Sequence, residues 1–339
     1  MPPSRLRLAC ASHAVHLQPL LDAISALNHV PTEACRLFHG RGGCFPGSEH
    51  WTLDAYPPVF LLTSFAAVPE AEVAQVQQAL TERLNVLAPG QPVHLVFQHR
   101  DEVRAHTQVL CGTVPDPHVV QEGGARYKVH LPRGFNHGLF LDMAEGRRWV
   151  RQAMAAQPGG RVLNLFAYTC AFSVAALQGG AGQVVNVDMA SGALNIGKQN
   201  HALNGLTHGA SFLPHDIFSS WGKITRSGPY DLLIADPPSY QKGSFVAEKD
   251  YARLMRRLAD LVVPGGHVLL CLNSPKLGPG FLQALMAEHA PGFTFVQRLA
   301  NPASFADISH ERAMKVMLYQ RTEFFSQEPA ASEGAGTTP

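Results

Sequence analysis

Four apolar, strand-length segments of this sequence each end in residues that can hold a ligand. In chain order the endings are Asn164 to Cys170, Asp188, His215-Asp216-Ile217 and Asp236-Pro237-Pro238. An acid at the end of the second strand of a nucleotide-binding sheet can accept both hydroxyls of a ribose, and Asp188 stands at such an end. Its position is equally typical of an acid at the start of the next helix.

The third and fourth endings offer contacts to a base and to a substrate. Asp216 can accept the exocyclic amine of an adenine, although an ordinary turn also favours aspartate. Pro237 and Pro238 fix the backbone and remove two N–H donors, which leaves rigid carbonyls able to face a substrate. We interpret Asp236-Pro237-Pro238 as functional because a doubly wound sheet binds its ligands beyond the carboxyl ends of its strands.

The sequence lacks the motifs of several other classes of protein. The turn after Asn164 has no Gly-x-Gly-x-x-Gly fingerprint and no Walker A sequence occurs, which argues against NAD, FAD and P-loop nucleotides. The 6 cysteines form no C-x-x-C pair and the 17 histidines are scattered, so we expect no metal site. The 27 basic and 26 acidic residues give a net charge of +1, which argues against a highly cationic nucleic-acid-coating protein but allows a local basic patch.

The expected location is the cytoplasm. No apolar stretch approaches the roughly 20 residues that span a bilayer. Arg5 and Arg7 are followed by His13, His16 and Gln18, which interrupt the apolar core that a signal peptide needs. The sparse cysteines fit a reducing compartment, in which a chain of this size needs no disulfides.

The residues from Arg147 onward alternate between strand and helix patterns. Expected strands cover residues 162–166, 183–188, 211–213, 230–236, 267–272 and 313–319, and expected helices cover 171–178, 191–203, 251–261 and 280–288. This alternation predicts an α/β fold, with a mostly parallel sheet covered by helices on both faces.

The first 135 residues predict a smaller α+β domain, and substrate recognition is one role open to it. Helix patterns cover residues 16–28 and 69–87, and strand patterns cover 59–63, 92–98 and 127–131. The glycine-rich segment from Leu37 to Gly47 is compatible with a substrate loop or with a cluster of structural turns. We therefore expect domains at 1–135 and 136–325, followed by a disordered tail at 326–339.

Together these residues resemble the class I S-adenosylmethionine-dependent methyltransferases, and among them the large-subunit (23S) ribosomal RNA methyltransferases of the K/L and I kind. The similarity covers about residues 120 to 320. It is carried by Gly138 to Met143 with Arg147, Asn164 to Thr169, Val187-Asp188, Asn200 to Gly205, Asp216, Asp236-Pro237-Pro238 and Gly265-Gly266. The resemblance implies a doubly wound, mostly parallel, seven-stranded Rossmann-like sheet and S-adenosyl-L-methionine as the cofactor.

The resemblance also implies which residues contact the cofactor. The segment from Asn164 to Thr169 is expected to wrap its methionine end, Asp188 to hold the ribose and Asp216 to lie by the adenine. The full expected set is Phe140, Asp142, Asn164, Phe166, Tyr168, Thr169, Asp188, Met189, Asp216, Ile217 and Asp236. Cys170-Ala171 departs from the family, which usually has a glycine there that allows close backbone approach to the ligand.

The segment after the expected fifth strand bears on which atom is methylated. Methylation of cytosine C5 needs a cysteine that attacks the ring, and cytosine-directed relatives carry it after this strand. Here Asn273 stands at that place, and Cys271 is more typical of an inert core residue. An asparagine resembles the K/L branch, which acts on guanine N7, an atom that needs positioning rather than activation. The expected catalytic residues are Asp236, Pro237, Pro238, Tyr240, which would stack on the base, and Asn273.

Three functions stay open on the sequence. The first is an RNA base methyltransferase with ribosomal RNA as partner, acting on guanine N7 or, alternatively, on cytosine C5. The second is the same chemistry on a small molecule or protein, which the near-neutral charge allows. The third is a non-catalytic binding module, supported only by Cys170-Ala171. A basic RNA-binding surface would draw on Lys242, Lys249, Arg253, Arg256, Arg257 and Lys276.

Overall fold

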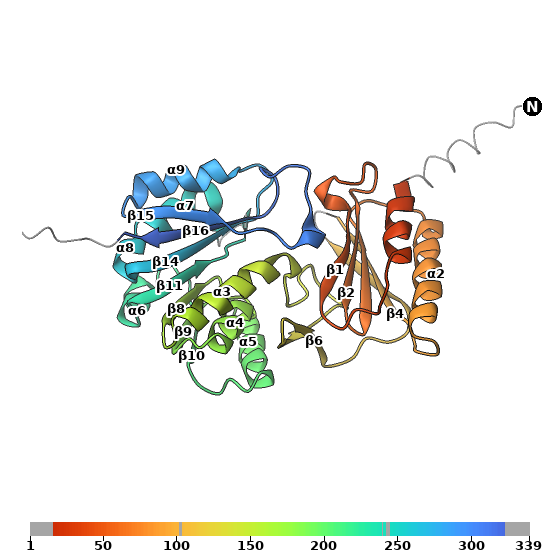
Figure 1. Cartoon of the computed structure of the whole chain (residues 1–339), viewed down its shortest axis with the longest axis horizontal. Helices are drawn as coiled ribbons and strands as arrows, with labels where there is room; N and C mark the ends of the chain where they lie inside the picture. Colours follow the sequence, from red (N-terminus) through yellow and green to blue (C-terminus); the bar gives the residue numbers. More distant parts are fainter. Residues whose placement is uncertain (1–15, 102–103, 239, 242–244, 323–339) are drawn as a thin grey trace, which may run out of the picture.

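The computed structural model describes residues 16–101, 104–238, 240–241 and 245–322, with the backbone alone described at 240–241. The tail expected at 326–339 lies outside these residues. The described chain forms two lobes, each built on its own β-sheet (Figure 1). Within these ranges, no helix has the length and apolar character that a membrane crossing requires.

The first lobe is a five-stranded sheet covered by two helices. Its order is β1 (Cys35–His39), β2 (Trp51–Tyr56), β3 (Val59–Ser64), β4 (His94–Arg100) and β5 (Ala105–Cys111). The β3–β4 pair is parallel, and α2 (Glu70–Leu87) makes the crossover. The apolar residues of α2 recur at steps of three and four, so one face of the helix is buried on the sheet beside a helix over residues 16–25.

The second lobe is a seven-stranded sheet. Its order is β10 (Ala210–Leu213), β9 (Gln183–Val187), β8 (Arg161–Leu165), β11 (Tyr230–Ala235), β14 (Val262–Leu272), β16 (Lys315–Arg321) and β15 (Phe293–Arg298). The pairs from β10 to β14 are parallel, and β16 runs antiparallel to both its neighbours. The chain moves outward in opposite directions from β8 and from β11, which makes the gap between these strands the topological switch point.

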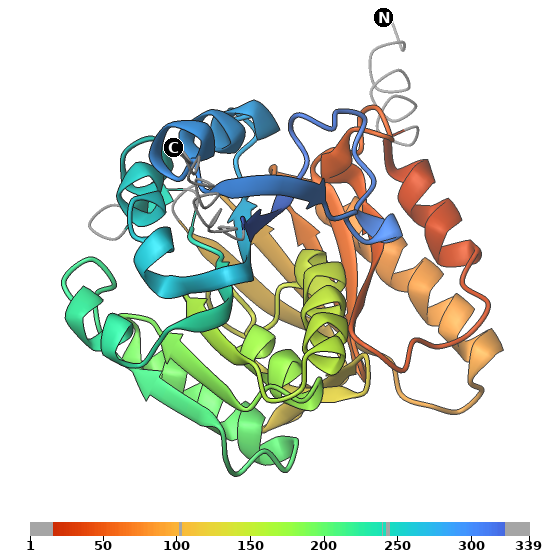
Figure 2. The ribbon, with the colours of Figure 1, turned by 60° about the vertical axis from the view of Figure 1, so that its left-hand side comes forward.

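Helices cover both faces of this sheet because its central strands are apolar on both sides (Figure 2). On one face lie α3 (Ala144–Ala156), α4 (Ala171–Gln178) and α5 (Ser191–Leu203). On the other lie α6 (Trp221–Arg226), α7 (Ala247–Met255), α8 (Leu258–Leu261) and α9 (Pro279–His289). The prediction of a doubly wound, mostly parallel seven-stranded sheet preceded by a smaller α+β lobe is confirmed.

A hairpin and two short 3-10 helices join the lobes. The hairpin consists of β6 (His118–Glu122) and β7 (Ala125–Val129), and its Tyr127 is buried in one apolar cluster with Leu61 of the first lobe and Val174 of the second. At another junction, η1 (Gly40–Gly42) meets the segment that contains η3 (Ala303–Phe305), where the Ile308 amide donates to the Gly42 carbonyl over 2.9 Å. The two lobes therefore pack directly against each other.

Some element boundaries differ from those that the sequence predicts. The helix expected from Tyr251 is instead α7, which begins at Ala247 and ends before the separate α8. The fifth strand of the second lobe begins at Val262, because β14 runs through Gly265-Gly266 with a shifted register. The sequence patterns also missed β1, β2, β5, β6, β15, α3 and α6, and the short hairpin of β12 (Tyr240–Gln241) and β13 (Phe245–Val246). Edge strands such as β15 are largely exposed, so they lack a clear apolar alternation.

Candidate functional site

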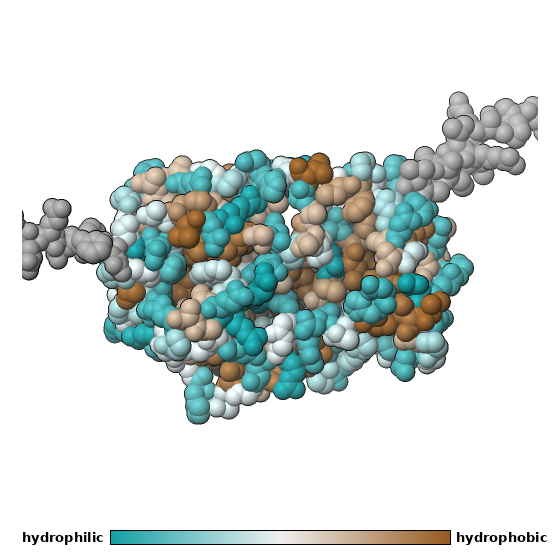
Figure 3. All heavy atoms as spheres, in the orientation of Figure 1, coloured by the Kyte–Doolittle hydropathy of each residue, from teal (hydrophilic) through white to brown (hydrophobic). Residues whose placement is uncertain are grey.

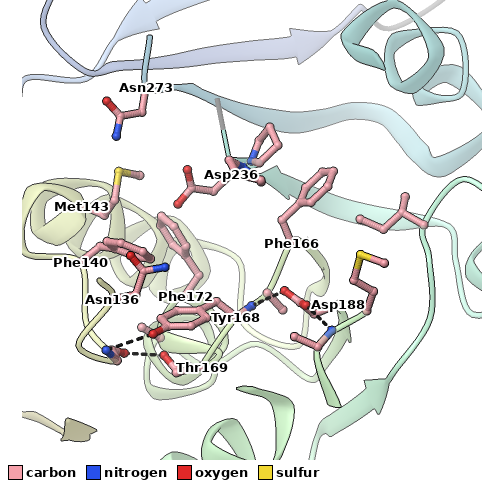
Figure 4. Close-up of a pocket in the computed structure, with 18 of the residues that line it drawn as sticks. Asn136, Phe140, Met143, Phe166, Tyr168, Thr169, Phe172, Asp188, Asp236 and Asn273 are labelled. Atoms are coloured by element: carbon pink, nitrogen blue, oxygen red, sulfur yellow. Dashed lines mark hydrogen bonds between the residues drawn. The ribbon is translucent and has the colours of Figure 1, made fainter. Parts of the chain in front are cut away.

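A cavity of about 350 Å³ lies at the carboxyl ends of the parallel strands, beside the switch between β8 and β11. It is lined by the loops after β8, β9, β10, β11 and β14, and by residues 136–143, which we call the flap (Figure 4). Its volume is within the range of about 300–1,000 Å³ typical of small-molecule sites. We call it the first cavity.

The first cavity gathers all but two of the site residues expected from the sequence. They arrive from five strand ends and the flap: Phe140, Asp142, Phe166, Tyr168, Thr169, Asp188, Met189, Asp216, Ile217, Asp236, Pro237, Pro238 and Asn273. The grouping follows from topology, since carboxyl ends of parallel strands meet at one edge of the sheet. Of Tyr240 the structure describes only the backbone, in β12.

Asn164 does not line the first cavity. Its side chain is 1% exposed in the middle of the sheet and donates to Asn186 Oδ1 over 2.9 Å. Asn186 in turn donates to Ser173 Oγ over 3.0 Å, and that hydroxyl bonds to His201 Nε2 over 2.8 Å. The structure therefore places Asn164, which was expected to contact the cofactor, in a buried polar network that braces β8 against β9 and α4 and not in the lining of the first cavity.

The loop between β8 and α4 has an unusual backbone. Phe166, Tyr168 and Cys170 have φ of 56°, 47° and 61°, a region that non-glycine residues rarely adopt. Each such residue costs on the order of 1–3 kcal/mol and persists only where the surroundings impose it. The strain is therefore concentrated in the loop that forms one wall of the first cavity.

Cys170 keeps the conformation that a glycine would adopt. It is fully buried, and a Cβ built on Gly197 of α5 would lie 2.5 Å from its Sγ, so the thiol fills the space beside that glycine. Burial raises the pKa of this thiol far above its ordinary value. The Cys170-Ala171 departure therefore preserves the path of the loop, and Cys170 is a packing residue without nucleophilic character.

Asp188 holds two loops together at the end of β9. Its Oδ2 accepts from the Tyr168 amide and its Oδ1 from the Ala190 amide, both over 2.8 Å. Each carboxylate oxygen accepts more than one bond, so both oxygens of Asp188, which lines the first cavity, can accept a further bond. The carboxylate is thereby oriented as a preformed acceptor.

The flap is fixed over the strained loop through Gly138. The Gly138 amide donates to the Tyr168 hydroxyl over 3.1 Å, and the Thr169 hydroxyl donates to the Gly138 carbonyl over 2.6 Å (Figure 4). Only glycine fits here, because φ is 96° and a Cβ would lie 2.8 Å from the Lys128 carbonyl oxygen. The Phe140 ring then lies against the Tyr168 ring, with centroids 5.3 Å apart.

A buried ion pair holds the flap from behind. The Arg147 guanidinium makes two 2.7 Å bonds to the Glu122 carboxylate of β6 and donates to the Phe140 carbonyl over 2.8 Å. Arg147 thus connects the hairpin, the flap and α3. Since its charge is neutralised by Glu122, the first cavity keeps an acidic character from Asp142, Asp188, Asp216 and Asp236.

Two of these acids influence each other. The pKa of Asp236 is raised to about 7, chiefly by burial and secondly by the neighbouring Asp142 carboxylate, while Arg147 opposes the shift. Burial also raises the pKa of Asp142, against the attraction of Arg36 and Arg147. Perturbed carboxyl groups in a cavity are typical of functional sites.

The end of β14 brings Asn273 to the first cavity and keeps Cys271 out of it. Cys271 is fully buried among apolar residues of the sheet, and burial raises the pKa of its thiol far above its ordinary value. Asn273 is exposed to the cavity beside Asp236 (Figure 4). Lys315 secures the loop that follows, because its buried ammonium donates to the Ser274 carbonyl.

Several lining residues were missed by sequence reasoning. They are Asn136, Met143, Phe172, His215, Phe218 and Met314. Met143 and His215 belong to motifs that the sequence analysis used, so their place next to expected site residues could have identified them. Met314 precedes the last strand, and no local pattern links it to a cavity formed by the loops of earlier strands.

The expected basic surface on α7 and α8 is partly neutralised. Arg253 pairs with Asp250 over 2.9 Å and lies 4.1 Å over the Phe218 ring, while Arg257 pairs with Asp260 over 3.1 Å. Arg256 is exposed and makes no side-chain bond within the described chain. Lys249 and Lys276 are exposed, and Lys242 lies outside the described residues. No group of three or more potential metal ligands occurs in the described part of the chain.

Comparison with known proteins identifies the family. The profile of the S-adenosylmethionine-dependent methyltransferases matches residues 35–320. Ribosomal RNA large subunit methyltransferase I of Photobacterium profundum is 30% identical over 283 residues, which are 80% of this chain and 68% of that protein. Methyltransferase I of Aeromonas hydrophila is 30% identical over 250 residues, which are 70% of this chain. The chain spans 61% of the length of that second relative.

A relative of the K/L kind and a solved structure are also similar to this chain. Ribosomal RNA large subunit methyltransferase K/L of Psychrobacter sp. is 37% identical over 188 residues, 53% of this chain and 23% of that protein. The crystal structure of SMU.776 complexed with SAH matches with a TM-score of 0.75 at 24% identity, covering 91% of this chain and 81% of that chain. At this identity the structural match shows the fold.

The matched profile runs through both lobes and across every loop that lines the first cavity. The chain therefore belongs to the S-adenosylmethionine-dependent methyltransferases, and S-adenosylmethionine is its cofactor.

Proposed function

We propose that this enzyme methylates a base of large-subunit ribosomal RNA, with guanine N7 as the accepting atom. The RNA substrate is supported by the relatives, which are named as ribosomal RNA methyltransferases of the I and K/L kinds. The choice of atom is carried by one observation: Asn273 lines the first cavity, and no cysteine does so among its described lining residues. Its proposed place of action is the cytoplasm, as the sequence predicts.

The first cavity fits the cofactor by its chemistry. S-adenosylmethionine carries a sulfonium and an ammonium group, and the cavity is lined by four carboxyl groups, whereas its one arginine is paired with Glu122. We assign Asp188 to the ribose hydroxyls, Asp216 with Ile217 to the adenine, and the loop from Phe166 to Thr169 to the methionine end. When bound, the cofactor supplies an electrophilic methyl group.

The protein's own residues then have to position a base. Guanine N7 carries a lone pair and no proton, so its methylation needs neither a covalent adduct nor a base catalyst. Asn273 and Asp236 lie on the same side of the cavity, where an amide and a carboxyl group can bond to a base edge (Figure 4). Pro237 and Pro238 hold the Asp236 backbone rigid, so the rate enhancement comes from orientation and fixed dipoles.

The test is methyl transfer to RNA. Purified enzyme is incubated with methyl-labelled S-adenosylmethionine and large-subunit ribosomal RNA from cells that lack this gene, and the RNA is digested to nucleosides. We expect the label in 7-methylguanosine. Label in 5-methylcytidine would overturn the assignment of the atom, and no label from an enzyme that binds the cofactor would overturn the RNA substrate.

Variants of the two candidate positions separate the two chemistries. Asn273→Ala is expected to lower kcat for transfer by about tenfold to a hundredfold while cofactor affinity stays unchanged, because the lost amide contacts the base. Cys271→Ser and Cys170→Ser are the matched controls, and both are expected to transfer methyl groups at close to the wild-type rate. Loss of transfer in either serine variant, with the fold intact by circular dichroism, would indicate covalent catalysis instead.

A further inference from the structure

A second cavity, of about 430 Å³, lies between the two lobes and adjoins the first. The residues that line both cavities are Asn136, Phe140, Asp142, Asn273 and Met314. The rest of the wall comes from β1, η1, β2, β3 and β4 of the first lobe with Phe65, from residues 135–141, from Pro275 and from the segment between Asn301 and Met314. On the face shown in Figure 3 the surface is hollowed between the lobes. A molecule in the second cavity would therefore lie against the flap and Asn273.

The first-lobe wall of this cavity carries three arginines in different states. Arg36 is fully paired, since its guanidinium bonds to both oxygens of Asp54 over 2.7 and 3.0 Å and to His39 Nδ1 over 2.7 Å. Arg41 and Arg100 have no carboxylate or carbonyl partner for their side chains within the described ranges. Two cations thus line a cavity with their hydrogen-bond donors unused.

Aromatic rings hold these two guanidinium groups in place. Arg41 lies 4.0 Å from the centroid of Phe65, and Arg100 lies 5.4 Å from Phe65 and 5.0 Å from Phe135. A guanidinium that contacts a ring through its face keeps its N–H donors available at its edges. The two guanidinium groups held by these rings therefore present N–H donors that are already oriented for a planar or tetrahedral anion.

The arginines also repel one another. Burial and the charge of Arg36 lower the pKa of Arg41, and burial with the charges of Arg41 and Arg36 lowers that of Arg100. Asp54 is paired with Arg36 and opposes only part of the shift at Arg100. An anion bound between Arg41 and Arg100 would relieve this repulsion, so the cluster is more stable with an anion than without one.

Two hydrogen-bond acceptors of the same cavity have no partner among the residues that the structure describes. His137 is 8% exposed; its Nδ1 bonds to the His130 carbonyl over 3.1 Å and so carries the proton, which leaves Nε2 as an unpartnered acceptor. Asn301 Oδ1 is likewise buried and unpartnered. Buried polar atoms are almost always bonded, so the natural occupant brings hydrogen-bond donors as well as negative charge.

We propose that the second cavity binds a ribonucleotide unit of single-stranded RNA next to the base being methylated, with its phosphate on Arg41 and Arg100. The sugar hydroxyls or base N–H groups of that unit satisfy His137 and Asn301. A ribonucleotide combines an anion and donors in one small unit, which is what this wall requires. The assignment rests on RNA being the substrate, and it gives the first lobe the role of holding the strand while Asn273 holds the base.

The test is RNA binding by a double variant, Arg41→Gln with Arg100→Gln. A short fluorescein-labelled single-stranded RNA of mixed sequence is titrated by anisotropy at several salt concentrations. We expect its affinity to fall by roughly tenfold for each arginine lost. The slope of log affinity against log salt should become shallower by about 0.7 for each phosphate contact removed. Arg226→Gln, which removes an exposed arginine at the end of α6 that lines neither cavity, is the matched control and should keep both values.

Two further measurements keep the subsite and the RNA function distinguishable. Cofactor affinity by calorimetry reports whether the double variant is folded, and the single Arg41→Gln variant serves if it is not, because Arg41 is exposed. RNA affinity and salt slope unchanged in a folded variant would overturn the subsite even if ribosomal RNA is methylated. If ribosomal RNA is not methylated, thermal stabilisation of the wild type but not the variant by uridine 5′-monophosphate would still support the subsite, and equal stabilisation of both would overturn it.

Discussion

Asp236 is the residue whose ionisation should control cofactor binding. Burial, with Asp142 adding to it, raises its pKa to about 7, so the carboxyl is largely neutral below that pH and charged above it. The cofactor is positively charged at its sulfonium and ammonium groups and favours the charged carboxylate. We expect cofactor affinity to rise with pH through about 7 and to level off above it, as measured by isothermal titration calorimetry between about pH 5 and 9.

The ionisation of Asp236 should also change the stability of the cofactor-free protein with pH. The folded-state pKa of about 7 lies above the ordinary 3.8, so the unfolded chain releases this proton first and stability falls as pH rises between these values. Asp236→Asn should remove both effects, whereas His215→Gln, which changes another titratable side chain of the first cavity, should keep the step in affinity. A step that survives in Asp236→Asn would assign it to a different group.

At the scale of elements, sequence reasoning succeeded where a local pattern determines the structure. The bounds of α4 and α5 follow from apolar spacing and from the glycines that end them, and the strand ends meet because the strands are parallel. It failed where a contact depends on packing between distant segments. Asn164 carries no local sign that Asn186 is its partner, and nothing in the sequence links Glu122 in β6 to Arg147 in α3. The second cavity was missed for the same reason, since its walls come from opposite lobes.

The Glu122–Arg147 pair should matter for both the flap and the fold. Their side chains are 12% and 5% exposed, so Glu122→Gln leaves a buried arginine without its counter-charge, which costs about 3–5 kcal/mol of unfolding free energy. Arg147 also bonds to the Phe140 carbonyl of the flap, so the same variant should bind the cofactor more weakly. Urea denaturation and calorimetry measure the two effects.

The control for this pair is a second glutamate–arginine contact, formed within α3 itself. Glu145 pairs with Arg148, whose side chain is 67% exposed, and exposed pairs contribute only about 0–1 kcal/mol. Glu145→Gln should therefore leave stability and cofactor affinity nearly unchanged. Equal losses in the two variants would show that the buried pair has no special role in holding the flap.

At the scale of the whole molecule, the distance between the lobes should determine the affinity for RNA without changing the affinity for the cofactor. Gly42 of η1 lies at their junction, and a Cβ built on it would be 1.9 Å from the Ala306 carbonyl oxygen. Gly42→Ala must therefore push the segment around η3 away from the first lobe and stretch the bond between the Ile308 amide and the Gly42 carbonyl. That segment and Arg41 both line the second cavity, whereas the first cavity is built almost entirely by the second lobe and the flap.

We expect Gly42→Ala to weaken binding of single-stranded RNA by roughly tenfold, a change of about 1.4 kcal/mol, while cofactor affinity changes less than twofold. Gly222→Ala is the matched control, because a Cβ at Gly222 in α6 meets open space and alanine raises helix stability by up to about 1 kcal/mol. Anisotropy with labelled RNA and calorimetry with the cofactor give the two affinities. If Gly42→Ala weakens the binding of RNA and of the cofactor to the same degree, the two lobes act as one site. The proposal that RNA and cofactor are bound separately is then wrong.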